Sequence, residues 1–457
     1  MKFKKLAAIA IGSVMAVGMC AGVTACKKEK DPNTIYIWAG GQWTGSDGEN
    51  LKKFCKWYED NNTLGLKIDV KIKADFEQVF AASTISSDSP DVMIWDRFNT
   101  PTYAADYVLE PIDDLIERDG IDASKFNATA YNELSYAGVQ YGLPLDLDLW
   151  GICINMDIVD AYNTANPSTK ITCLWEEDGT TPRYDWNWDD VLEVAGKLKG
   201  FQYKKGSRDV TVYNGYDGVN VKEFFIHNYF STGEDYLIDG KPVCNNDAGV
   251  ATLEYLHKLR RTGDNDGYKD QKSFVQGNLA MFMRPTYFVN YLNTYAKSMN
   301  VRFMPQPAAT IEGGDNRGVM GGFGMAIPRP IKDKFRTQAW EDKKAKCWEF
   351  MKDWLYNDAT MREWAEVTMT IPALISAQSS PEVQANTVLK DVIPFADKYT
   401  TRPGVPGWTS VQVEVFNNYV DTFCKGGSTG AEEIKKTLST IERESKFYLD
   451  SYGSQKN

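Results

Sequence analysis

The region from residue 34 to residue 95 alternates strand and helix patterns, and this alternation restricts the fold more than any other feature of the chain. Thr34–Trp38 and Ile68–Ile72 are predicted to be strands, the second with alternating apolar residues, and Leu51–Tyr58 between them starts a helix. Asp91–Trp95 is a largely continuous apolar strand, which is typical of a parallel sheet covered on both faces. The order predicts βαβ units and an α/β fold.

Further strands and helices are predicted along the rest of the chain. Gly151–Met156, Val301–Pro305 and Gly324–Ile327 have strand patterns, and Asn187 is predicted to cap a helix. Residues 162–186 are polar and irregular, which indicates a surface insertion.

The first 30 residues have the features of an export signal. Three lysines open the chain, and the apolar, small-residue run Leu6–Ala25 follows them. Val23–Cys26 resembles the lipobox of bacterial lipoproteins, which implies that the Cys26 thiol is diacylglycerated and that the chain is cut before it. We therefore expect a signal peptide over 1–25, a lipid-anchored tether over 26–33, and a location at the extracellular face of the cell membrane. An uncleaved membrane helix is the alternative, since about twenty apolar residues can span a bilayer.

The charge of the chain limits its partners. The formal net charge is −11, and loss of the signal peptide removes three lysines and no acid, which gives about −14. An acidic surface argues against nucleic acid, because phosphate binding needs a basic face. No second apolar run approaches membrane length, so the lipid anchor is the only expected membrane contact.

The cysteine and histidine content gives no metal-binding pattern. The six cysteines beyond Cys26 include no C-x-x-C pair, and the chain has only two histidines, so we expect neither a metal nor a cofactor. Most of the six are expected to be buried thiols, although export would permit a disulfide between Cys173 and Cys244.

The order of several short motifs resembles that of the sugar-binding solute-binding proteins of bacterial ABC importers, typified by maltose-binding protein. Tyr141–Pro144 and Ile154–Asp157 are similar to the family's Y-G-L-P and Y-N-K-D, and Phe274–Met281 is similar to its F-x-x-G-x-x-A-M. Lys344–Leu355 with Ile371–Ala373 is similar to its helix followed by a Pro-Ala turn. The resemblance covers nearly the whole mature chain.

This resemblance implies two α/β lobes of the type II periplasmic-binding-protein-like fold, with a ligand cleft between lobes joined by hinge crossings. Lobe 1 is expected to contain 34–145 and 304–357, and lobe 2 to contain 146–303 and 358–457. The implied function is capture of a mono- or oligosaccharide by hinge closure and its delivery, by a monomeric receptor without enzymatic activity, to the permease of an ABC importer.

The strongest predicted binding residues are Trp95, Asp96 and Arg97. They follow a buried strand at its carboxyl end, where open parallel sheets present ligands. The resemblance implies that the carboxylate and guanidinium hold sugar hydroxyls while the indole packs on the ring. The alternative is a structural Asp–Arg pair with Trp95 in the core.

Asp146 and Asp148 follow the Tyr141–Pro144 turn. Asp148 falls where the family has a ligand-contacting Glu, and Asp146 points the same way along an extended segment. The alternative is a solvated hinge pair. Both carboxyls belong to one strand, whereas glycoside hydrolysis needs two carboxyls flanking one bond, which argues against that activity.

The remaining candidates lie in predicted loops, or at positions where the resemblance implies a ligand-contacting residue. Tyr287 stands where the family has a stacking Trp, and this departure weakens the case for a long linear glucan. Together with the residues above, the predicted ligand-binding set is completed by Gln42, Trp43, Arg284, Tyr287, Gly322, Phe323 and Trp408.

Two alternative functions remain at this point. The same fold could bind a polyamine, a peptide or a charged sugar acid, because the three aspartates tolerate a cation while Arg97 and Arg284 tolerate an anion. The chain could also be a surface glycoside hydrolase, which turnover of an oligosaccharide would reveal.

Overall fold

The computed structural model describes residues 31–40, 43, 45–85, 88–220, 224–427 and 429–454. The signal peptide, Cys26, most of the tether and Gln42 therefore lie outside the described residues. In the part of the chain that is described, no helix is both long enough and apolar enough to span a membrane.

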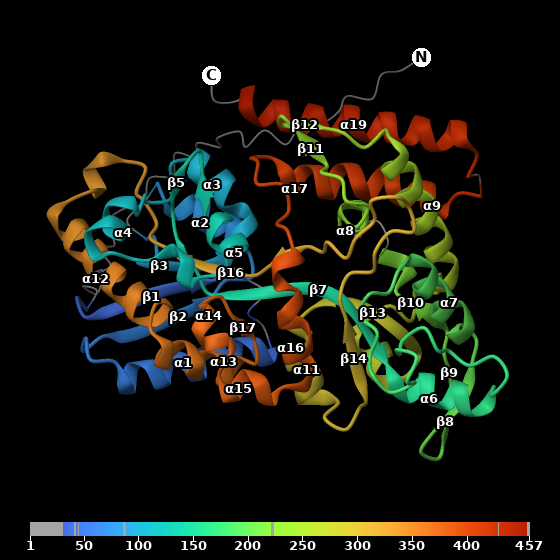
Figure 1. The fold of residues 1–457 in the computed structure, drawn as a ribbon. Coiled ribbons are helices and arrows are strands. Elements are labelled where there is room, and N and C mark those ends of the chain that lie inside the picture. The colour runs from blue at the N-terminus through green and yellow to red at the C-terminus, as the bar shows by residue number, and fades with distance from the viewer. Residues whose placement is uncertain are drawn as a thin grey trace, which may run out of the picture.

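The chain forms two α/β lobes side by side, and the long strand β7 (Asp146–Asn155) runs from one to the other (Figure 1). The sheet of the first lobe has the order β2-β1-β3-β16-β6. β1 pairs in parallel with both β2 and β3, as the βαβ pattern predicted, and β16 pairs antiparallel with β3 and β6. The bounds of these strands are β1 Thr34–Ala39, β2 Lys67–Ile72, β3 Val92–Asp96, β6 Leu143–Pro144 and β16 Phe323–Ala326.

The second sheet has the order β10-β13-β7-β14 and is mostly antiparallel. The second half of β7 pairs with β13 and β14, whereas its first half pairs with β15 and β17. One strand is thus built into the second sheet at one end and held by connecting segments at the other. The bounds are β10 Asn214–Tyr216, β13 Leu279–Pro285, β14 Val301–Met304, β15 Met320–Gly321 and β17 Ile371–Pro372.

Helices cover both sheets, and three short two-stranded ribbons decorate them. The helices of the first lobe and the crossing region are α1 Gly45–Asn61, α2 Phe76–Ser83, α3 Thr100–Ala105, α4 Asp113–Asp119, α5 Ala128–Asn132, α11 Phe288–Tyr295, α12 Gln338–Leu355, α13 Asp358–Thr368, α14 Ile375–Gln378, α15 Pro381–Ala385 and α16 Thr387–Val392. Those of the second lobe are α6 Met156–Ala165, α7 Trp188–Leu198, α8 Phe225–Phe230, α9 Asp247–Thr262, α10 Gln271–Gln276, α17 Trp408–Ser410, a π-helix Val411–Val420, α18 Asp421–Lys425 and α19 Ala431–Ser454. The ribbons pair β4 Ser135–Tyr136 with β5 Val139–Gln140, β8 Gln202–Lys205 with β9 Arg208–Thr211, and β11 Leu237–Ile238 with β12 Lys241–Pro242.

The helix that was predicted to start at Asn187 is confirmed as α7. The Asn187 side chain accepts hydrogen bonds from the N–H groups of Asp189 and Asp190, and the Asp190 carboxylate accepts one from the backbone N–H of Asn187. The predicted surface insertion, 162–186, is confirmed only in part. Helix α6 continues to Ala165 and the remainder is irregular apart from an isolated bridge between Trp175 and Pro182, but Ile171, Leu174 and Trp186 are buried in the core of the second lobe.

Helix α13 packs against the first lobe, which differs from the expected boundary that placed 358–457 in lobe 2. The Trp364 ring lies 5.1 Å from Phe54 of α1 and 5.5 Å from Trp354 of α12. The physical reason is the apolar stripe of α13, which buries its one large ring, Trp364, against rings of α1 and α12.

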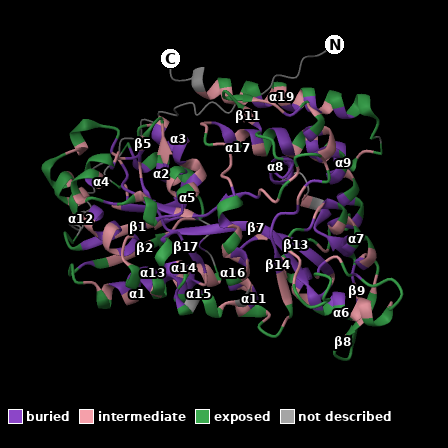
Figure 2. Cartoon of the chain, viewed as in Figure 1, coloured by how far each residue is buried: buried purple, intermediate pink, exposed green. Residues whose placement is uncertain are grey.

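Helices and loops shield the central strands of each lobe from solvent. In Figure 2 the central strands of the two sheets, such as β7 and β13, are mainly purple, while the outer faces of peripheral helices such as α19 are green. All six cysteines within the described residues are free thiols, and only Cys173 is not fully buried, so the alternative Cys173–Cys244 disulfide does not form here.

Candidate functional site

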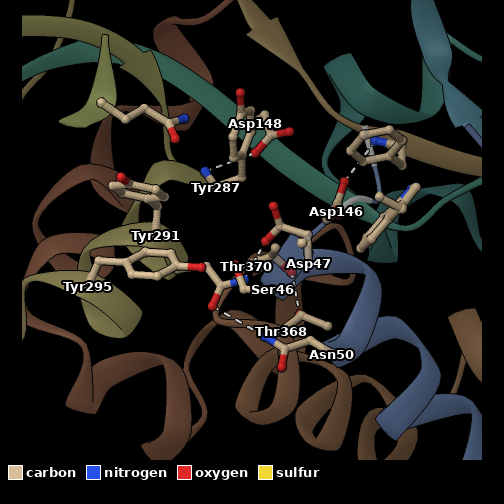
Figure 3. A pocket seen from close by; sticks show the side chains of 15 residues that line it. Ser46, Asp47, Asn50, Asp146, Asp148, Tyr287, Tyr291, Tyr295, Thr368 and Thr370 are labelled. Carbon is tan, nitrogen blue, oxygen red and sulfur yellow. Dashed lines mark hydrogen bonds between the residues drawn. The ribbon is translucent and has the colours of Figure 1, made fainter. Parts of the chain in front are cut away.

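A cavity of about 410 Å³ lies where β7 crosses between the lobes (Figure 3). Its walls come from the start of α1, the first half of β7, α11 and the segment between α13 and β17. The lining residues are Trp43, Gly45, Ser46, Asp47, Asn50, Asp146, Asp148, Gln271, Tyr287, Asn290, Tyr291, Tyr295, Phe323, Thr368 and Thr370. Five predicted site residues are therefore brought together here: Trp43, Asp146, Asp148, Tyr287 and Phe323.

Asp146 and Asp148 place two buried carboxyl groups on the cavity wall. They are alternate residues of β7 and therefore point to the same side of the strand. The N–H of Phe323 donates to Asp146 Oδ1 at 2.7 Å, and the N–H of Tyr287 donates to Asp148 Oδ1 at 3.3 Å. Each carboxyl group is thus positioned by the backbone of a different neighbouring segment.

Burial makes both groups hard to ionise. Asp146 is 1% exposed, and loss of hydration raises its pKa to about 7, although the Phe323 N–H and the Arg97 guanidinium oppose the shift. Burial, and then the charge of Asp146, raise the pKa of Asp148 well above its usual range. Near neutral pH the pair thus holds protons that exposed aspartates would have lost.

The start of α1 supplies a polar wall, and Trp43, which lies before the helix, supplies one aromatic ring. Trp43 packs against Phe323 with ring centroids 4.8 Å apart. Asn290 of α11 donates to Asp47, and Asn50 donates to Asn290 Oδ1 at 3.2 Å, so side chains of α1 and α11 are bonded across the cavity (Figure 3). Burial raises the pKa of Asp47.

Helix α11 supplies three tyrosines, of which the sequence analysis identified only the first. Tyr287, Tyr291 and Tyr295 recur every fourth residue and all line the cavity. This spacing places side chains on one helical face, so it was a usable signal that the sequence analysis did not exploit.

Two of the predicted binding residues, Trp95 and Trp408, lie in the interior and are not among the residues that line this cavity. Trp95 is buried among Phe80, Tyr103 and other residues of a separate core cluster. Trp408 is buried against Tyr236 and Phe416. The reason is that each ring faces the layer of helices behind its strand or helix.

Arg97 is also structural in this arrangement. It is fully buried, pairs with Glu133 at 3.0 Å, and donates to the carbonyl oxygens of Asp146, Gly321 and Phe323. Its guanidinium therefore fixes the start of β7 to the β15–β16 connection and does not line the cavity.

Gly322 shapes the same connection without lining the cavity. Its φ is +128°, and a Cβ atom there would lie 2.5 Å from Arg97 Nη1 and 2.6 Å from the Asp146 carbonyl oxygen. Glycine is required because no other residue fits this backbone next to Arg97.

Asp96 and Arg284 form ion pairs away from the cavity lining. Asp96 bonds to Arg402 at 2.6 Å, and the Arg402 guanidinium stacks on Phe98 at 3.9 Å. Arg284 lies 3.9 Å from Asp217. No sequence pattern pointed to Arg402, because the pairing joins residues 306 positions apart.

Within the described residues, no cluster of three or more His, Cys, Asp or Glu side chains is suited to a metal ion.

Two α/β lobes joined by a crossing strand, with a cavity at the crossing, define a two-lobed ligand-binding protein. The chain belongs to the bacterial extracellular solute-binding protein family, whose family model matches residues 53–391.

Two relatives from Bacillus subtilis agree with this assignment. The chain is 22% identical over 442 residues to the maltodextrin-binding protein MdxE of Bacillus subtilis, with 91% of this chain and 92% of the relative covered. It is 23% identical over 300 residues, 62% of each chain, to an arabinooligosaccharide-binding protein of the same organism.

Solved structures share the fold. The cyclic alpha-maltosyl-1,6-maltose binding protein of Arthrobacter globiformis superposes with a TM-score of 0.67 at 17% identity, with 92% of this chain and 100% of that one covered. A solute-binding protein of Thermotoga lettingae bound to alpha-D-tagatose gives 0.66 at 16% identity, with 90% and 100% covered.

Proposed function

We propose that this chain is a lipid-anchored receptor that captures a carbohydrate in the cavity between its lobes and delivers it to the permease of an ABC importer. The observation that carries the proposal is the lining of the cavity, which combines aromatic rings with carboxyl, amide and hydroxyl groups. A sugar has apolar ring faces and a hydroxyl rim, so it matches both kinds of surface. The names of the two Bacillus subtilis relatives support an oligosaccharide ligand.

Two buried polar atoms that belong to lining residues support a hydroxyl-bearing ligand. Trp43 Nε1 and Asp146 Oδ2 are covered, and neither has a hydrogen-bond partner within the described structure. Unpaired buried polar groups are unfavourable. A sugar hydroxyl can accept from an indole N–H and can hydrogen-bond to a carboxyl oxygen, so a hydroxyl group that reached these atoms as the lobes move would supply the partner that each atom lacks.

A cationic solute such as a polyamine is the second candidate, and one observation favours it over an anionic ligand. The described lining contains three aspartates and neither lysine nor arginine. A sugar acid would add a negative charge beside carboxyl groups whose ionisation is already disfavoured, and it would meet no lysine or arginine in this lining. An ammonium group would instead favour ionisation of these carboxyl groups and would also be attracted by the aromatic faces.

Thermal-shift and calorimetric titration of the chain starting after Cys26 tests the proposal. A ligand present at about 100 times its dissociation constant should stabilise the fold by about 2.7 kcal/mol. The panel contains maltose, maltodextrins, arabino-oligosaccharides, glucuronate and spermidine. Binding of spermidine alone, or hydrolysis of an oligosaccharide, would overturn the carbohydrate-receptor proposal.

The anchor is tested separately. Cys26→Ala removes the acyl acceptor, so the protein should remain uncleaved or be released from the membrane. Cys20→Ala is the matched control and should leave processing unchanged. Normal processing and membrane retention of Cys26→Ala would contradict the lipid anchor and leave ligand capture unaffected.

A further inference from the structure

The three tyrosines of α11 form a continuous aromatic face along the cavity. Tyr287 directly precedes α11 with helical dihedral angles, φ −58° and ψ −21°, so it continues the register of Tyr291 and Tyr295. Residues four apart on a helix share a face and are separated by about 6 Å along its axis. The three side chains therefore lie about one helical turn apart along one face of the helix. We call Tyr287, Tyr291 and Tyr295 the tyrosine face.

Burial decreases along the tyrosine face from the floor of the cavity to its mouth. Tyr287 lies beside Asp148, to which its N–H donates. Tyr291 is half-buried and stacks on Phe288 at 5.5 Å, and its ring lies 4.7 Å from that of Tyr295. Tyr295 is 60% exposed although it lines the cavity. A large aromatic ring exposed beside a cavity offers a free surface for a ligand that extends outward.

The wall opposite the tyrosine face is polar. Ser46, Asp47 and Asn50 project from the first turns of α1 toward the tyrosines (Figure 3). A ligand in the cavity, beside the Asn290 hydrogen bonds that join α11 to α1, would have aromatic rings on one side and hydrogen-bonding groups on the other. Sugar units present an apolar face and a hydroxyl rim, whereas a single unit at the floor would leave Tyr295 without a contact.

We propose that the tyrosine face is a track for successive units of an oligosaccharide. The innermost unit lies at Tyr287 beside the two β7 carboxyl groups, and outer units pass along the exposed part of Tyr291 and stack on Tyr295 toward solvent. This inference rests on the proposed carbohydrate function and adds the ligand's length and direction. It predicts that affinity rises with the number of units until Tyr295 is reached.

The test is calorimetric titration of wild-type protein and variants with maltose through maltohexaose, and with the arabinose series from the disaccharide to the hexasaccharide. Tyr295→Ala should weaken binding of the longer members of the bound series about five- to tenfold, and should leave the shortest bound member within about twofold. Tyr295→Phe keeps the ring and should retain the wild-type length dependence. Phe447→Ala on α19 is the matched control, since Phe447 is also 60% exposed.

The length at which the loss begins gives a second readout. Tyr291→Ala should weaken binding from a shorter oligosaccharide onward than Tyr295→Ala does. The tyrosine-face inference is overturned if wild-type protein binds all lengths equally, or if Tyr295→Ala changes every length by the same factor or none. If wild-type protein binds no sugar of either series, the proposed function fails together with the tyrosine-face inference. That result differs from sugar binding without length dependence, which overturns the tyrosine-face inference alone.

Discussion

The backbone N–H of Phe323 holds Asp146, while the N–H of Tyr287 holds Asp148, although the two aspartates are only two residues apart on β7. Phe323 belongs to the sheet of the first lobe, and Tyr287 directly precedes α11 after β13 of the second sheet. The two carboxyl groups therefore sit at the point where both lobes meet the crossing strand. A relative movement of the lobes would change the surroundings of both.

The stability of the ligand-free protein should fall as pH rises from about 4 to about 7. Asp146 has a folded-state pKa raised to about 7 from an ordinary value of 3.8, so the folded state retains a proton that the unfolded state has lost. The stabilising effect is complete below the ordinary value and is lost as pH passes the raised one. Melting curves should show a decrease of several degrees, and Asp146→Asn should flatten it. An unchanged pH profile in Asp146→Asn would contradict the assignment.

Arg97→Met should destabilise the fold by about 3–5 kcal/mol, because it leaves the buried Glu133 carboxylate without its cation. Three carbonyl oxygens at the lobe crossing also lose their donor. Urea unfolding measures the change. Arg118→Met is the control, since Arg118 pairs at the surface and should change stability by less than about 1 kcal/mol. Normal stability with lost ligand affinity would restore the original ligand-binding interpretation of Arg97.

Trp95→Ala should lower stability by about 3–5 kcal/mol, as expected for truncation of a buried ring. The affinity of the fraction that remains folded should stay within about twofold of wild type. Calorimetry beside a melting curve separates the two effects. Tyr107→Ala, at a 72% exposed ring, should change neither quantity. A large loss of affinity with an unchanged melting temperature would show that Trp95 contacts the ligand.

Gly322→Ala should destabilise the protein by about 1–3 kcal/mol, because the backbone there has a positive φ and the new Cβ would collide with Arg97. Gly196→Ala in α7 has no atom within 4 Å of the new Cβ and should stabilise by up to about 1 kcal/mol. Chemical denaturation of both variants measures this difference in sign. Equal tolerance of the two substitutions would contradict the role assigned to Gly322.

Asn290→Ala should favour a more open ligand-free molecule, because Asn290 bonds to both Asp47 and Asn50 across the cavity. Small-angle scattering should show a larger radius of gyration without ligand, and a saturating ligand should reduce it by hinge closure. Asn293→Ala on the same helix is the control. Identical scattering from Asn290→Ala and wild type would argue that these hydrogen bonds do not hold the lobes together.

The local sequence patterns predicted many of the elements. Alternation and apolar runs identified β1, β2 and β3, and the side chain of Asn187 identified the start of α7. These signals depend on neighbours within a few residues, so they can be read without the fold. The family resemblance, which depends on motif order along the chain, likewise predicted two lobes and the cavity position of Asp148 and Tyr287.

Long-range packing decided the rest. Trp95 and Arg97 follow the strand end that was predicted to face a ligand, yet one packs into the helix layer and the other binds Glu133 and three carbonyl groups. Arg402 reaches Asp96 from 306 residues away. A residue's type and local pattern determine whether it prefers a strand, a cap or burial. Which side of a strand faces a neighbouring helix, and which charge lies opposite, depends on how distant segments fill space and exclude water, and only the tertiary structure determines that.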